Sequence, residues 1–148
     1  MKRFLGGAAT IALCTGLFGV IGTGTAAAVN THQFNLNADL YGPDYGYTIG
    51  GVTFHNQDVV IQGSVKSHTT GCVQAQFDIS LGTSTGVTKT ETRTACGRGT
   101  GTSTDFHFTV DMPAGGTDHV DVYLNQNITS TTGRWQHIAS DTLWNSDL

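Results

Sequence analysis

Apolar and polar residues alternate with a period of two along most of this 148-residue chain, and this period constrains the fold more than any other feature. Successive side chains of a strand point to opposite faces of a sheet, whereas a helix repeats every 3.6 residues. The alternation is clearest over residues 73–81, where Phe77 is flanked by Gln76 and Asp78. It recurs over residues 32–40, 59–65, 106–110 and 120–124. The chain is therefore expected to be all-β, with antiparallel strands buried on one face.

Turn residues separate these segments at spacings of roughly ten residues, as in all-β sandwiches and barrels. The chain contains 20 Gly against 2 Pro, and only 12% of its residues are charged. A Thr-rich strand is expected over residues 87–96, and a short last strand over residues 134–139. With about eight strands and no amphipathic helix, the sequence predicts a single antiparallel β-sandwich of the jelly-roll or immunoglobulin-like type.

The N-terminus has the three parts of a secretory signal peptide. Lys2 and Arg3 precede an uncharged apolar run over residues 4–21, and small residues ending at Ala28 follow. A transmembrane anchor is the competing interpretation, but several glycines dilute the run; a lipoprotein would need a small residue before Cys14, where Leu13 stands. We therefore expect residues 1–28 to be cleaved, leaving residues 29–148 as a secreted domain with no membrane span. The composition of the leader favours a bacterial source.

Two cysteines, Cys72 and Cys96, remain beyond the leader. An even pair in an exported protein predicts one disulfide, against the alternatives of two free thiols or a metal site. A structural zinc site usually needs four ligands. The disulfide is therefore expected.

Charge and motif content exclude several classes of function. The formal net charge is −4, with only seven Lys and Arg. Because nucleic-acid binding needs clustered basic residues, no nucleic-acid partner is expected. The G-x-S-x-G pattern of a nucleophilic serine occurs once, over residues 82–86, but this segment has the composition of a turn between two strands and no helical pattern follows it, so no serine nucleophile is expected. Whether the chain is an enzyme stays open, with a non-catalytic role favoured.

A hairpin over residues 104–125 would gather polar side chains on one face, because its apolar residues occupy the other. This candidate polar face consists of Asp105, His107, Asp111, His119 and Asp121. Three interpretations stay open for it: a solvated sheet surface, a His–Asp pair for acid–base catalysis, or a site for a divalent ion. No cofactor is required by any motif; zinc suits the imidazoles and calcium suits the carboxylates, if a metal is bound.

Aromatic residues form the second candidate site. Three lie in the segment Y-G-P-D-Y-G-Y and two near the C-terminus: Tyr41, Tyr45, Tyr47, Trp135 and Trp144. Exposed aromatic rings can stack on the apolar faces of sugars, and the alternative is that these rings are buried in the core or at its edges.

The leading hypothesis is a secreted, non-catalytic recognition domain that binds an extracellular polysaccharide, or an extracellular or cell-surface protein. The alternative is a small secreted protease inhibitor or toxin-like effector, with Arg98 as the residue entering a trypsin-like pocket. A metal-dependent hydrolase using the His and Asp face of residues 104–125 is the third hypothesis.

Overall fold

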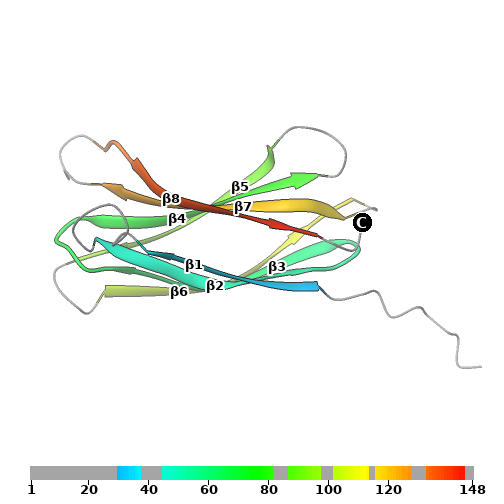
Figure 1. Cartoon of the computed structure of the whole chain (residues 1–148), viewed down its shortest axis with the longest axis horizontal. Helices are drawn as coiled ribbons and strands as arrows, with labels where there is room; N and C mark the ends of the chain where they lie inside the picture. The colour runs from blue at the N-terminus through cyan, green and yellow to red at the C-terminus, as the bar shows by residue number, and fades with distance from the viewer. Residues whose placement is uncertain are drawn as a thin grey trace, which may run out of the picture.

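Two four-stranded antiparallel sheets face one another in the computed structural model, which describes residues 30–37, 45–81, 87–97, 102–113, 116–127 and 133–145. The first sheet has the order β1-β2-β3-β6 and the second has the order β5-β4-β7-β8 (Figure 1). The strands are β1 (Asn30–Asn37), β2 (Gly46–Phe54), β3 (Asp58–Ser67), β4 (Cys72–Leu81), β5 (Val87–Cys96), β6 (Thr102–Asp111), β7 (Thr117–Asn127) and β8 (Gln136–Trp144). The expected all-β sandwich of eight strands is confirmed.

The core lies between the sheets and is made by the apolar half of each alternating strand. Phe77 on β4 is fully buried at its centre, and its ring contacts three rings from the first sheet. The centroid distances are 5.8 Å to Phe34, 5.3 Å to Phe106 and 5.6 Å to Phe108. The period-two pattern thus supplies one continuous core from both inner faces.

Two glycines let these rings lie directly on the first sheet. Gly50 and Gly63 are paired across β2 and β3. A Cβ atom on Gly50 would lie 2.7 Å from the ring of Phe34, and one on Gly63 would lie 3.0 Å from the ring of Phe106. Each Cβ atom would also clash with a backbone oxygen of the paired strand, that of Gln62 or Ile49, so a larger residue would disturb the strand pairing as well as the core rings.

The predicted disulfide is confirmed. Cys72 and Cys96 are directly paired at one end of β4 and β5, and their sulfur atoms are 2.02 Å apart. The disulfide joins two strands of one sheet, whereas a hydrogen bond nearby joins the two sheets: the hydroxyl of Thr104 on β6 donates at 3.0 Å to the carbonyl of Thr94 on β5. The guanidinium of Arg93 also lies 4.1 Å from the ring centroid of Phe108. The edge formed by β5 and β6 is therefore closed.

The opposite edge is more open. A cleft of about 250 Å³ lies between β1 and β8, with Leu36 and Ile138 among the residues that line it. Most side chains of β8 are exposed, and Leu143 is the one that is fully buried. The structure places this strand at Gln136–Trp144, so the predicted span of 134–139 was wrong at its end. Ser140, Asp141 and Thr142 give an edge strand too little apolar periodicity to mark its length.

The predicted hairpin over residues 104–125 is wrong. β6 pairs with β3 in the first sheet, whereas β7 pairs with β4 and β8 in the second. Both strands bury their apolar residues, but those residues face each other across the core instead of sharing one face. Alternation alone cannot distinguish two neighbouring strands from two facing strands, because both present an apolar side to the same core.

Several predicted features lie outside the described residues: the signal peptide over residues 1–28, Tyr41, and Arg98. Within the described ranges, no helix is long and apolar enough to cross a membrane.

Candidate functional site

The candidate polar face predicted from sequence is divided between two surfaces. Asp105, His107 and Asp111 point outward from β6 on the first sheet and are exposed. His119 and Asp121 point outward from β7 on the second sheet. Because the core separates the two sheets, these five side chains do not form one site. Across the described part of the chain, no group of three His, Cys, Asp or Glu residues is placed to hold a metal ion.

The outer face of the second sheet instead brings together polar residues from four strands. Phe77 and its apolar neighbours on β4 point inward, so the residues between them point outward. The pairing register then aligns these outward residues in rows with residues of β5, β7 and β8. We call this surface the binding face. Its rows are Ser80, His119 and Trp144; Thr90, Asp78, Asp121 and Thr142; Thr92, Gln76, Tyr123 and Ser140; and Thr94, Gln74, Asn125 and His137.

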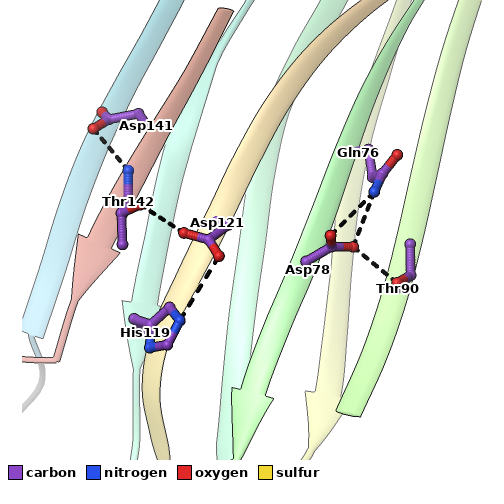
Figure 2. A network of polar contacts seen from close by, with 7 residues as sticks. All are labelled: Gln76, Asp78, Thr90, His119, Asp121, Asp141 and Thr142. Carbon is purple, nitrogen blue, oxygen red and sulfur yellow. Dashed lines mark hydrogen bonds and ion pairs between the residues drawn. The ribbon is translucent and has the colours of Figure 1, made fainter. Parts of the chain in front are cut away.

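Two aspartates occupy the centre of the binding face. Asp78 on β4 and Asp121 on β7 are directly paired across neighbouring strands. Figure 2 shows the two carboxylates turned away from each other, with Asp78 turned towards Thr90 on β5 and Asp121 towards Thr142 on β8. Like charges in directly opposed positions destabilise a sheet. Their diverging orientation reduces this repulsion.

Each carboxylate is held by donors on its own side. The hydroxyl of Thr90 donates to Asp78 at 2.8 Å, and the amide nitrogen of Gln76 lies 3.1 Å from both Asp78 oxygens. The hydroxyl of Thr142 donates to Asp121 at 2.6 Å. These bonds fix two charged acceptors on a rigid part of the fold.

Tyr123 completes the polar centre in the next row, beside Gln76. Burial raises the pKa of the Tyr123 phenol above its ordinary value, and the negative charges of Asp121 and Asp78 raise it further. The interaction of its hydroxyl with the Asp121 carboxylate adds a smaller increase in the same pKa. The phenol therefore stays protonated and acts as a donor at neutral pH.

An exposed aromatic pair lies at one end of the binding face. The side chain of Trp144 on β8 is 59% exposed, and its ring packs against His119 on β7. The two centroids are 4.7 Å apart and the planes are inclined by 39°. His119 Nε2 lies 3.7 Å from a carboxylate oxygen of Asp121. The imidazole thus connects the exposed indole to the acidic centre of the face.

The other predicted aromatic residues do not join this pair. Tyr45 packs against the core, and Tyr47 lies on the first sheet with its ring edge-on to His68. Trp135 is 36% exposed and precedes β8, whereas Trp144 ends that strand. Tyr45, Tyr47 and Trp135 therefore lie away from Trp144, which is the one among the described members of the predicted set that borders the polar centre.

The sequence alone did not identify Asp78 as a member of a site. The alternation placed Asp78 on an outward face, but nothing in the sequence marked its partner. Asp78 meets Asp121 only because β4 pairs with β7, and two other strands separate these two in the chain. Searches of protein-family models, of curated proteins and of solved structures found no match to this chain.

Proposed function

We propose that this protein is an extracellular, non-catalytic recognition domain that binds a polysaccharide through the binding face. The observation that carries the proposal is the exposed ring of Trp144, packed on His119 and next to a hydrogen-bonded polar centre. An exposed aromatic ring offers an apolar face to a ligand, and the polar groups beside it can hydrogen-bond to the same ligand.

The chemistry of the binding face suits a sugar chain. The face of an indole ring packs well against the C–H groups of a sugar, and the sugar hydroxyls need both donors and acceptors around it. Asp78 and Asp121 supply acceptors, and the exposed hydroxyls of Thr92 and Ser140 in the next row can donate as well as accept. Because strands and hydrogen bonds fix these groups, binding loses little side-chain entropy.

An extracellular location agrees with the leader-like N-terminus and with the disulfide. Disulfides persist in oxidising compartments, so Cys72–Cys96 is compatible with export. The formal net charge of the chain is −4, and removal of Lys2 and Arg3 with the leader would make it −6.

The test is co-sedimentation of the purified protein with insoluble polysaccharides and cell walls, with and without calcium. We expect saturable binding that Trp144→Ala weakens at least about tenfold, which corresponds to ~1.4 kcal/mol. Trp144→Phe keeps an aromatic ring and should retain part of the affinity. The matched control is Ile49→Ala, because Ile49 is 44% exposed on the outer face of the first sheet.

Equal loss of binding in Trp144→Ala and Ile49→Ala would contradict the placement of the site. Absence of saturable binding to every polysaccharide would contradict the function itself. The protein-partner and inhibitor hypotheses would then be tested by affinity capture and by protease inhibition.

A further inference from the structure

The charge of the binding face restricts the kind of sugar that it can accept. Asp78 and Asp121 lie at its centre, and the described side chains of the face include no Lys or Arg. The basic residues of β5, Lys89 and Arg93, alternate to its other side, where both pair with Glu91. An anionic ligand on this face would therefore meet two carboxylates with no Lys or Arg beside them.

The hydrogen-bonding capacity of the two aspartates indicates what they can bind. A carboxylate has about four acceptor positions. Asp78 uses part of this capacity for Gln76 and Thr90, and Asp121 uses part of it for Thr142. The remaining positions accept hydrogen bonds from hydroxyl groups. A carboxylate or sulfate group of a ligand has no proton to donate there.

The distance between the aromatic ring and the carboxylates sets a minimum ligand length. Trp144 is on β8, and Asp78 lies two strands away and one row along. Strand spacing and residue rise place these two positions roughly 12 Å apart. This separation of the two backbone positions is longer than a single sugar ring, so a ligand that stacks on Trp144 and also reaches Asp78 is expected to extend across β7.

We infer that the binding face takes an uncharged, hydroxyl-rich polysaccharide that crosses β8, β7 and β4. One sugar unit stacks on Trp144, and the following units donate hydroxyl hydrogen bonds to Asp121 and Asp78. This inference rests on the proposed function and adds the ligand's charge, its minimum length and its direction across the strands.

The experiment measures binding of soluble hexasaccharides by titration calorimetry. The uncharged probes are cellohexaose, xylohexaose, mannohexaose and N-acetylchitohexaose; the anionic probes are hexagalacturonate and a heparin hexasaccharide. We expect at least one uncharged probe to bind and every anionic probe to bind about tenfold more weakly or worse. The monosaccharide unit of the bound probe should not compete.

The variant with both Asp78→Asn and Asp121→Asn tests the role of the carboxylates. It removes charge with little change in shape, so uncharged-probe binding should weaken and the discrimination against anionic probes should shrink. Asp105→Asn is the control, because Asp105 is exposed on the other sheet.

The possible failures are distinguishable. If an anionic probe binds to the wild-type protein as tightly as the uncharged probes, the inference is overturned and polysaccharide binding stands. If discrimination is unchanged in the doubly substituted variant, the two aspartates do not set it. If no probe and no insoluble polysaccharide binds, both the inference and the proposed function are wrong.

Discussion

The pairing of Asp78 with Asp121 predicts a measurable conflict between stability and binding. Directly opposed residues have Cβ atoms roughly 5 Å apart, and two charges at that distance repel by about 0.8 kcal/mol in water. The Asp121 side chain is only 22% exposed, which strengthens the repulsion, whereas the diverging carboxylates weaken it. We therefore expect a coupling energy of about 0.5–1 kcal/mol.

A double-mutant cycle isolates this energy. Asp78→Asn and Asp121→Asn each remove the whole repulsion, and together they can remove it only once. The doubly substituted protein should therefore be less stable than the sum of the single effects predicts, by the coupling energy. Urea unfolding at neutral pH measures the four free energies, and added salt should reduce the coupling because the pair is partly exposed.

Asp78→Asn combined with Asp105→Asn provides the control cycle, because these residues lie on opposite outer faces. Their effects should add. If the Asp78 and Asp121 effects also add within about 0.3 kcal/mol, or if their coupling has the opposite sign, the argument for a repulsive pair at the site is refuted.

Two further predictions concern stability. The folded state holds the Tyr123 proton more tightly than the unfolded chain does, so the free energy of unfolding should fall as pH rises above about 10. Tyr123→Phe should remove this fall. An equal dependence on pH in the variant and the wild-type protein would contradict the assignment to Tyr123. Replacing Cys72 and Cys96 by Ser should lower the free energy of unfolding by about 3.5 kcal/mol, because the disulfide closes a loop between cysteines 24 positions apart. Urea unfolding measures this loss, and a value below ~1 kcal/mol would show that the link constrains the unfolded chain little.

The sequence was sufficient to predict the strands but not all of their neighbours. Alternation around Phe77 and around Phe34 identified which side chains are buried, because burial on one face of a strand requires that period. It could not assign β6 and β7 to different sheets. The segment from Met112 to Gly116 is compatible with a tight hairpin and with a crossing between sheets, and the apolar pattern is the same for both.

The candidate site was predictable only in part for the same reason. Trp144, His119 and Asp121 were each named from the sequence, but as members of two different sites. The register of β7 and β8 brings them together, and the pairing of β4 with β7 adds Asp78. Register between strands distant in the chain depends on the packing of the whole core, which a local pattern does not contain. A site that spans a sheet face is therefore harder to predict than the strands that carry it.

Two directly paired aspartates lower the stability of a sheet, and such unfavourable pairs are expected where the residues are needed for binding. The hydrogen-bond donors around Asp78 and Asp121 reduce the repulsion between the two carboxylates. A sheet that had only to be stable would have opposite charges or neutral pairs in this row.

The most direct test of the account is to map the bound surface by NMR. Backbone and side-chain signals of the labelled protein would be followed during titration with whichever hexasaccharide binds. The account predicts that shifts concentrate on Trp144, His119, Tyr123 and Asp121 on the outer face of the second sheet. Shifts confined to the outer face of the first sheet, around Ile49 and His107, would contradict it.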